Sequence, residues 1–301
     1  MAAPWVLTGA SGWFGRTALW EYEFLHGPDA LRSDVVACAS SSKLIDFGSP
    51  HGPIQVVGLE ALEQIHNAAG LIHLAFLTRD RVAEIGLERY IQTNRAITAG
   101  IAAFLQHNPA IPIITTSSGA AAVLDGQPPD LEGNPYATLK QEEEALWRHC
   151  GASRMAAVFR VYAASGRFIK DPRLFALSDF LSKAVAGQQI EVRSQRPVIR
   201  SYVHVGTMMR LFWAMLRTPI TPGFLQVDAC METLSLVELA QIISGLWGLP
   251  EPLFGIDPSL EADRYEADAG PFGELLDRYH IAHLDLPGQL RETAGDLAAL
   301  S

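Results

Sequence analysis

Tyr136, Lys140 and two upstream serines are the side chains of this sequence whose types and spacing best suit catalysis. Tyr136 and Lys140 are four residues apart in a predicted helix, so they lie one turn apart on the same face. A nearby ammonium stabilises a phenolate and lowers the pKa of the tyrosine, which favours proton transfer near neutral pH. A predicted strand ends just before Ser117 and Ser118, whose hydroxyls could bind a substrate carbonyl or stabilise a turn.

A glycine-rich turn follows the first predicted strand and opens a helix. A tight turn needs residues without Cβ, and a helix N-terminus offers free N–H groups to a pyrophosphate. An ordinary tight turn would have the same glycines, but this position in the chain favours a dinucleotide site. The predicted cofactor-binding residues here are Gly9, Ser11, Gly12, Trp13, Phe14 and Gly15.

The second predicted strand is followed by Ser40, Ser41, Ser42 and Lys43. No carboxylate stands there to bind the ribose hydroxyls of NAD. Three hydroxyls and an ammonium suit the 2′-phosphate of NADP, so we expect NADP as the preferred cofactor and NAD as the alternative. A serine-rich loop that binds nothing is also compatible with the pattern.

Short apolar segments alternate with helical patterns through the first half of the chain, which predicts a parallel sheet covered by helices on both faces. The fold class is therefore α/β, with a Rossmann-type doubly wound sheet over residues 1–165. A smaller substrate-binding region covers residues 166–301, with some segments returning to the sheet. The predicted strands are Trp5–Thr8, Val35–Ala39, Ile54–Val57, Gly70–Ala75, Ile111–Thr115 and Met155–Val161, and the predicted helices are Gly12–Leu25, Arg79–Gln106, Tyr136–Cys150 and Leu234–Leu246.

Asn94 is the polar member of an apolar stripe on the long predicted helix, which also carries Tyr90 and Phe104. A buried amide needs hydrogen-bond partners. Asn94 either holds a water that relays protons to Lys140 or is a core asparagine whose hydrogen bonds are satisfied, and the stripe does not decide between them.

Composition excludes several classes of function. The formal net charge of −10 disfavours nucleic-acid binding, and no apolar stretch is long enough to span a membrane. Three widely spaced cysteines and the lack of a signal peptide predict a cytoplasmic protein with reduced thiols, and we expect no metal site. Two basic clusters could bind an anion such as phosphate or could simply be solvated: Arg160, Arg167, Lys170 and Arg173, and Arg193, Arg196 and Arg200.

In combination, the glycine turn, the strand end at Thr116–Ser118 and the Tyr136–Lys140 pair resemble the short-chain dehydrogenase/reductase superfamily. Three further segments are similar to those of its extended branch, the NAD-dependent epimerase/dehydratase family: Leu71–Ala75, Val158–Gly166 and Arg200–Val205. That branch includes nucleotide-sugar epimerases, dehydratases and reductases, so the resemblance implies an NAD(P)-dependent enzyme.

The resemblance also implies roles for individual residues. Tyr136 would be the general acid/base, Lys140 would tune it and bind the nicotinamide ribose, and Ser118 would orient the substrate oxygen. The other implied roles are a proton relay through Asn94, cofactor contacts at Leu74 and Ala75, and binding of the substrate diphosphate by Arg200 with Arg193 or Arg196. A homodimer would form through Tyr90–Leu105 and the helix after Tyr136.

Departures from the family pattern leave the substrate open. Ala163 stands where sugar-nucleotide enzymes carry an asparagine, Thr207 stands where they carry an aspartate, and Gly119-Ala120 replaces the Asp-Glu pair of 4,6-dehydratases. We expect hydride transfer at a sugar-nucleotide carbon, as in an epimerase or reductase. The alternatives are a reductase or dehydrogenase of a small carbonyl compound or secondary alcohol, and a non-catalytic NAD(P)-sensing protein.

Overall fold

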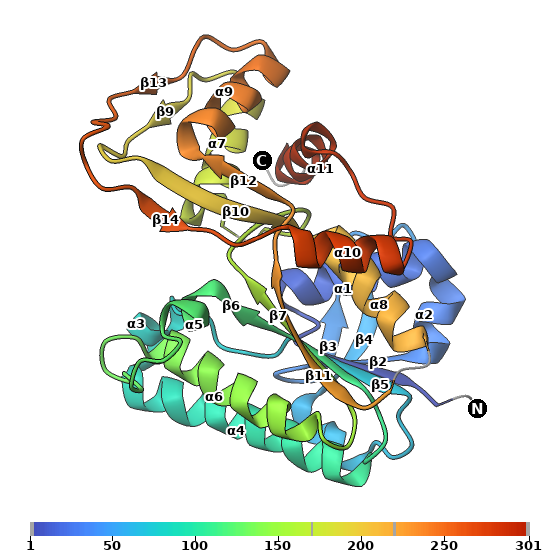
Figure 1. Ribbon diagram of the computed structural model, residues 1–301. Coiled ribbons are helices and arrows are strands. Elements are labelled where there is room, and N and C mark those ends of the chain that lie inside the picture. Colours follow the sequence, from blue (N-terminus) through green and yellow to red (C-terminus); the bar gives the residue numbers. More distant parts are fainter. Residues whose placement is uncertain (1–2, 170, 219–220, 299–301) are drawn as a thin grey trace. The chain divides into compact units, whose positions relative to one another are not determined.

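The computed structural model describes residues 3–169, 171–218 and 221–298, and they form two compact units (Figure 1). The first unit consists of Met1–Arg160 and Phe212–Val227, and the second of Val161–Leu211 and Asp228–Ser301. The chain therefore leaves the first unit after the seventh strand and returns to it for one helical segment and one strand.

The first unit is built on an eight-stranded sheet with the order β11-β7-β6-β5-β1-β2-β4-β3. Its strands are β1 Trp5–Thr8, β2 Val35–Ala39, β3 Lys43–Ile45, β4 Ile54–Gly58, β5 Gly70–His73, β6 Ile113–Ser118, β7 Met155–Val161 and β11 Gly223–Ala229. β1 pairs in parallel with β2 and β5, and β5 pairs in parallel with β6. This order and direction confirm the predicted Rossmann-type sheet.

Helices cover both faces of this sheet. They are α1 Trp13–His26, α2 Pro28–Asp34, the 3₁₀ helix η1 Leu59–Gln64, α3 Arg81–Ile85, α4 Leu87–His107, α5 Gly119–Val123, α6 Pro135–Cys150 and the end of α8 Val205–Arg217. Figure 1 shows α4 and α6 side by side along one face. Their side chains Phe104 and Trp147 pack against Val6 and Ile113 of the sheet.

The opposite face is covered by α1 and the end of α8. The rings of Tyr22 and Trp213 lie 4.7 Å apart, and the Trp213 indole N–H donates to the Ala18 carbonyl at 2.9 Å. Burial on both faces explains why the central strands are almost wholly apolar, because neither side of the sheet meets water.

Two predicted elements differ most from the structure, while the predicted strand Gly70–Ala75 ends early, at His73, and the predicted helix Leu234–Leu246 begins late, at Leu236. The predicted single helix Arg79–Gln106 is wrong, because Gly86 (φ 82°) interrupts it and separates α3 from α4. The predicted strand Ile111–Thr115 begins and ends too early, since β6 extends to Ser118. Ser118 then caps α5, and its side chain accepts a hydrogen bond from the Ala120 N–H at 3.2 Å.

The second unit is organised around one central strand, β10. Its strands are β8 Ala163–Ser165, β9 Glu191–Val192, β10 Val198–His204, β12 Glu232–Ser235, β13 Leu253–Phe254 and β14 Asp263–Tyr265. Its helices are η2 Pro172–Leu174, α7 Ala176–Val185, α9 Leu236–Trp247, α10 Gly270–Arg278 and α11 Leu286–Ala298. β10 pairs with β12 antiparallel and with β14 and β8 in parallel, and α7 packs against α9 and α11.

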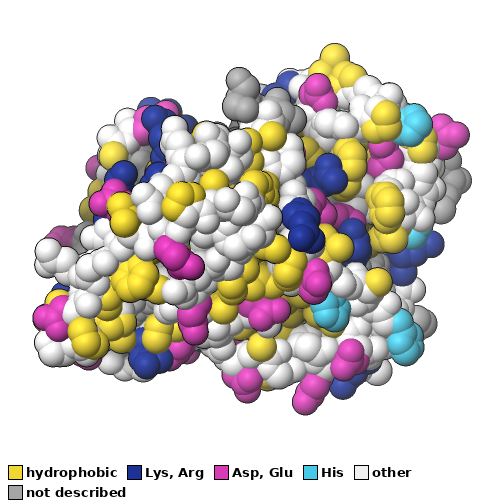
Figure 2. All heavy atoms as spheres, turned by 90° about the horizontal axis from the view of Figure 1, so that it is seen from above, with side chains coloured by type: hydrophobic (Ala, Val, Ile, Leu, Met, Phe, Trp, Pro, Cys, Tyr) yellow, Lys and Arg dark blue, Asp and Glu magenta, His cyan; other side chains and the backbone are white. Residues whose placement is uncertain are grey.

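Carboxylates pair with the arginines of the first basic cluster, for which the sequence left open a bound anion or a solvated face. The Arg160 guanidinium donates to both Asp125 and Glu144, and Arg167 pairs with Glu292 at 3.3 Å. Arg173 pairs with Asp171, while Lys170 lies outside the described residues. These arginines are thus accounted for by carboxylates without a bound anion. On the face drawn in Figure 2, basic and acidic side chains are interspersed in small groups.

Within the described ranges, no helix is long and apolar enough to cross a membrane. Among those same residues, no group of three or more histidine, cysteine, aspartate and glutamate side chains is arranged to hold a metal ion.

Candidate active site

The glycine turn brings β1 into contact with the chain that follows β5. Gly9 has φ +75°, and a Cβ there would lie 2.5 Å from the Leu74 carbonyl carbon and 2.8 Å from the Ala75 nitrogen. The predicted cofactor residues Leu74 and Ala75 therefore lie directly beside the turn. Only glycine allows both this φ and this close approach.

Gly12 and Gly15 complete the turn at the start of α1. The Gly12 N–H donates to the Gly9 carbonyl at 2.9 Å, and a Cβ on Gly15 would collide with that same carbonyl and with Ala10. α1 begins at Trp13 without a side-chain cap. A cradle with no room for a side chain and an uncapped helix start fit a dinucleotide pyrophosphate, and Gly9, Gly12 and the N–H groups of Trp13 and Phe14 would hold it.

The loop after β2 carries the residues expected at the cofactor ribose. Ser40, Ser41 and Lys43 are exposed. The Ser42 hydroxyl accepts a hydrogen bond from the Gly58 N–H at 3.0 Å, so this serine fastens the loop to the end of β4. Burial, with the nearby charge of Glu60, raises the pKa of the Cys38 thiol on β2 to about 12. No carboxylate follows β2 directly, but the Glu60 carboxylate on η1 lies close to this strand.

The predicted catalytic side chains meet where β6 ends and α6 begins. Pro135 starts α6, its fixed φ suits a first helical residue, and Tyr136 follows in the first turn. The side chains of Tyr136 and Ser118 are hydrogen-bonded to each other. The Lys140 ammonium donates to the Thr116 carbonyl at 3.1 Å. The structure thus brings Ser118, Tyr136 and Lys140 together.

Phe76 and Glu143 complete this cluster, and the sequence analysis missed both. The Lys140 ammonium lies 3.7 Å from the centre of the Phe76 ring and 2.8 Å from a Glu143 carboxylate oxygen. The Phe76 and Tyr136 rings meet edge to face, with centroids 5.8 Å apart. Glu143 is three residues after Lys140, a spacing that places both on one helix face, so the sequence carried a signal for it.

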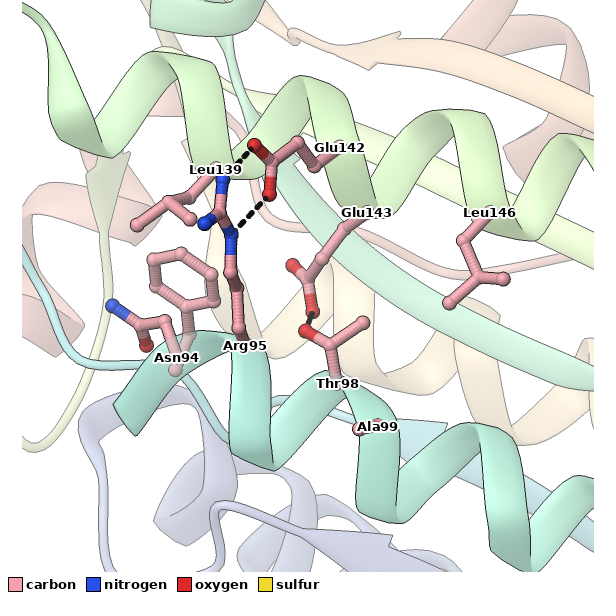
Figure 3. Close-up of a pocket in the computed structure, with 9 residues that line it drawn as sticks. Asn94, Arg95, Thr98, Ala99, Leu139, Glu142, Glu143 and Leu146 are labelled. Atoms are coloured by element: carbon pink, nitrogen blue, oxygen red, sulfur yellow. Dashed lines mark hydrogen bonds and ion pairs between the residues drawn. The ribbon is translucent and has the colours of Figure 1, made fainter. Parts of the chain in front are cut away.

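Glu143 is buried and fully engaged. Besides Lys140, its carboxylate accepts a hydrogen bond from the Thr98 hydroxyl at 3.0 Å and lies 3.2 Å from the His73 Nε2 atom. Figure 3 shows Glu143 on α6 pointing toward Thr98 on α4. The other His73 nitrogen lies 2.8 Å from the Thr8 hydroxyl. His73 is therefore a buried histidine with both nitrogens satisfied.

The electrostatics of the cluster differ from what Tyr136 and Lys140 alone predict. Burial raises the pKa of Tyr136, the charge of Glu143 raises it further, and the hydrogen bond with Ser118 lowers it. Burial also acts to raise the pKa of Glu143, but Lys140 and His73 outweigh it and hold that pKa well below its usual value. The pKa of Tyr136 thus moves opposite to the expected direction, chiefly because the hydroxyl is buried and additionally because the Glu143 anion lies near it.

Asn94 fastens the loop after β5. Its side-chain oxygen accepts from the Leu77 N–H at 2.8 Å, and its amide donates to the Leu77 carbonyl at 3.4 Å. The Tyr90 hydroxyl donates to the same carbonyl at 2.9 Å. Both ends of the Asn94 side chain are therefore engaged with main chain, as in a satisfied core asparagine. Asn94 also lines a pocket between α4 and α6 that reaches Glu143 (Figure 3).

The two predicted substrate-binding arginines are not brought together within the second unit. The Arg200 guanidinium donates to the Asp263 carboxylate at 2.7 and 3.2 Å. It lines a pocket that also contains Tyr162, Ala163 and Tyr265. Arg193 lines a different pocket, is 77% exposed and lies 3.6 Å from Glu191. Arg200 is thus already paired with an acid, and Arg193 does not line its pocket.

The sheet order, the glycine turn and the Tyr136–Lys140 pair together define an extended short-chain dehydrogenase/reductase. Residues 5–223 match the family model described as "NAD dependent epimerase/dehydratase family". The chain belongs to the NAD-dependent epimerase/dehydratase family. A comparison with curated protein sequences finds no match.

Solved structures share this fold across the whole chain at low sequence identity. MoeE5 in complex with UDP-glucuronic acid and NAD is 18% identical with a TM-score of 0.71, covering 99% of this chain and 100% of that one. UDP-N-acetylglucosamine 4-epimerase from Methanobrevibacter ruminantium is 19% identical with a TM-score of 0.71, covering 100% of both chains. UDP-glucuronic acid 4-epimerase from Bacillus cereus is 13% identical with a TM-score of 0.71, covering 99% and 100%. At these identities the likeness establishes the fold.

Replacing Gly9 by alanine tests the close approach between the turn and the chain after β5. We expect Gly9→Ala to lose at least about 2 kcal/mol of unfolding free energy, since a left-handed φ and a main-chain collision add, and to abolish dinucleotide binding. Urea unfolding and titration with NAD(P)H measure the two effects. Gly100→Ala is the control, because no atom lies within 4 Å of a Cβ there, and it should gain up to about 1 kcal/mol. Equal stability and binding of Gly9→Ala and the wild type would refute the role of Gly9.

Proposed function

We propose that the protein is an NAD(P)-dependent oxidoreductase or epimerase that moves a hydride to or from a carbonyl or hydroxyl carbon of a sugar nucleotide. The observation that carries this proposal is the meeting of Ser118, Tyr136 and Lys140 at the carboxyl end of β6. Membership of the family supports the chemistry. The substrate class is supported by similar structures, which are described as complexes with UDP-sugars and NAD.

Each residue of the cluster has a defined task in this proposal. The glycine turn and the main chain at Leu74 and Ala75 hold the dinucleotide, which supplies or accepts the hydride when bound. Ser118 and Tyr136 orient the substrate oxygen by hydrogen bonds, and Tyr136 exchanges a proton with it. Lys140 is fixed beside Tyr136 by the Thr116 carbonyl. Asn94 keeps the loop after β5 in place through Leu77, and a proton relay through Asn94 stays a prediction.

Removing the Tyr136 hydroxyl tests the catalytic assignment. We expect Tyr136→Phe to lower kcat/KM at least about 100-fold, because a positioned proton donor contributes that much, while the dissociation constant for NAD(P)H stays unchanged. Tyr279→Phe removes a hydroxyl that is not part of the Ser118, Tyr136 and Lys140 cluster and should retain full turnover. Unchanged turnover of Tyr136→Phe would overturn the assignment. Dinucleotide binding by the wild type without turnover on any sugar nucleotide or small carbonyl compound would favour the non-catalytic sensor.

We further propose that NADP is preferred over NAD. The exposed hydroxyls of Ser40 and Ser41 and the Lys43 ammonium follow β2, where a 2′-phosphate would need positive charge and hydrogen-bond donors. Two observations weigh against this preference. The family is described as NAD dependent, and the Glu60 carboxylate near the end of β2 would repel a phosphate.

The cofactor preference can be measured by titrating the protein with NADPH and NADH. We expect Lys43→Ala to weaken NADPH binding about 10-fold, the loss of one hydrogen bond to a charged group, and to leave NADH binding unchanged. Lys43→Arg keeps the charge and should retain NADPH binding. Tighter binding of NADH than of NADPH by the wild type would refute the preference.

A specific observation favours a second candidate, a reductase or dehydrogenase of a small carbonyl compound or alcohol. The pocket at Arg200 is lined by the aromatic side chains of Tyr162, Phe175, Tyr202 and Tyr265. Its one arginine is paired with Asp263. A diphosphate would have to compete with that carboxylate, whereas an uncharged ligand would not.

Nucleotide binding separates the two candidates. With saturating NADPH, the sugar-nucleotide proposal expects one of UDP, dTDP, GDP and CDP to raise the melting temperature. A ligand at a hundred times its Kd adds about 2.7 kcal/mol to the stability. Arg200→Ala should reduce that rise. If NADPH stabilises the protein but no nucleotide adds to it, the small-carbonyl candidate is favoured.

Two expectations from the sequence stay predictions. One is a homodimer through α4 and α6, and the other is a cytoplasmic location.

A further inference from the structure

The buried carboxylate of Glu143 has no task in the proposed chemistry, although it contacts the catalytic lysine directly. Its side chain is 4% exposed, and that of Lys140 is 6% exposed. The separation of 2.8 Å between Lys140 Nζ and Glu143 Oε2 makes this a buried ion pair. Such a pair costs desolvation and persists only where its other hydrogen bonds are satisfied. Thr98 and His73 satisfy them here.

The ammonium of Lys140 is occupied on several sides. One N–H donates to Glu143, another donates to the Thr116 carbonyl, and the Phe76 ring covers the nitrogen at 3.7 Å. An ammonium has three N–H donors. Lys140 therefore presents Tyr136 with a neutralised pair rather than with a free positive charge.

Other charged groups around the cluster do not restore that positive charge. From β5, His73 faces Glu143 with one nitrogen and the Thr8 hydroxyl with the other. From α4, Arg95 is half-exposed and bound by Glu142. Tyr90, also on α4, is itself held protonated, since burial and the nearby Tyr136 raise its pKa. Glu143 therefore determines how strongly the positive charge of Lys140 acts on Tyr136.

We propose that Glu143 is a positioning residue that neutralises Lys140, keeps Tyr136 protonated and so sets the site to donate a proton to a substrate oxygen, as the reduction of a carbonyl requires. This inference rests on the proposed function and adds the direction of the reaction, which is reduction. In that step the reduced dinucleotide, which the glycine turn would hold, would supply the hydride that the substrate carbon gains, and the carbonyl π-electron pair would move to the oxygen. The oxygen takes the Tyr136 proton, and the tyrosinate regains one from solvent.

The geometry and the acid–base properties agree on this point. A tyrosinate would lie close to the Glu143 anion, and burial already disfavours its charge. The pKa of Tyr136 is accordingly raised by burial and by Glu143. A hydroxyl that stays protonated at neutral pH is ready to donate, whereas oxidation of an alcohol needs a tyrosinate to accept the proton.

The decisive experiment is a pH titration of Tyr136 in the protein without cofactor, by NMR of ¹³Cζ-labelled tyrosine. The chain has seven tyrosines, and the signal lost in Tyr136→Phe assigns the residue. We expect a Tyr136 pKa above 10 in the wild type and a fall of at least one unit in Glu143→Gln. The glutamine keeps the shape and removes the charge, so Lys140 acts on Tyr136 uncompensated.

Glu142→Gln is the matched control. Glu142 is the preceding residue on α6, it loses the same charge, and it pairs with Arg95 on the exposed side of the same pocket. We expect the Tyr136 pKa in Glu142→Gln to equal that of the wild type. An equal fall in both variants would overturn the inference, and so would no fall in Glu143→Gln. If Glu143→Gln does not fold, the wild type still tests the inference, because a Tyr136 pKa below the ordinary value of a tyrosine contradicts a neutralised Lys140.

Kinetics then separate this inference from the proposed function. In carbonyl reduction, the alkaline limb of the kcat/KM profile should move to lower pH in Glu143→Gln and stay in place in Glu142→Gln. A shifted Tyr136 pKa without turnover of any sugar nucleotide, in reduction, oxidation or epimerisation, would retain the role of Glu143 and refute the proposed function. If the protein reduces a carbonyl but the alkaline limb of the kcat/KM profile does not move in Glu143→Gln, the proposed function is retained and the role of Glu143 is refuted.

Discussion

The close contact between Gly9 and the main chain at Leu74 and Ala75 is the constraint on which the candidate site depends. It fixes the segment after β5 against the glycine turn, so that the next two residues have little freedom. Phe76 then covers the Lys140 ammonium, and the main chain of Leu77 is held by Asn94. One short segment therefore connects the predicted dinucleotide cradle with the predicted catalytic cluster. A larger residue at position 9 would disturb both at once.

Helix α6 contributes two consecutive glutamates that are buried for different reasons. Glu143 faces Lys140 and His73 next to Tyr136, and Glu144 faces Arg160 of β7. Each carboxylate neutralises one cation inside the first unit. Arg160 is held by two carboxylates, and burying its charge without them would be costly. These ion pairs explain how an acidic chain keeps several charges in its interior while Tyr136 meets little net positive charge.

The sequence predicted the parallel sheet, its central strands and the Tyr136–Lys140 pair, because apolar alternation and residue spacing encode these features locally. Its errors were also physical. Gly86 breaks the long helical pattern because its positive φ turns the chain between α3 and α4. For the basic residues around Arg160 the sequence left open a bound anion or a solvated face, because their acidic partners are distant in sequence. Asp125 lies 35 residues before Arg160, and Glu292 lies 125 residues after Arg167.

What the sequence determined by itself is the fold class, the glycine turn and the presence of a serine, a tyrosine and a lysine at suitable spacings. Each depends on residues close together in the chain. Only the tertiary structure decided what surrounds Lys140, because Glu143 is held by Thr98, 45 residues away, and by His73, 70 residues away. The sequence spacing places Glu143 on the same helix face as Lys140, but only burial in the tertiary structure lets the Glu143 charge affect Tyr136. In water the Glu143 charge would be screened, whereas in the interior it acts directly on Tyr136.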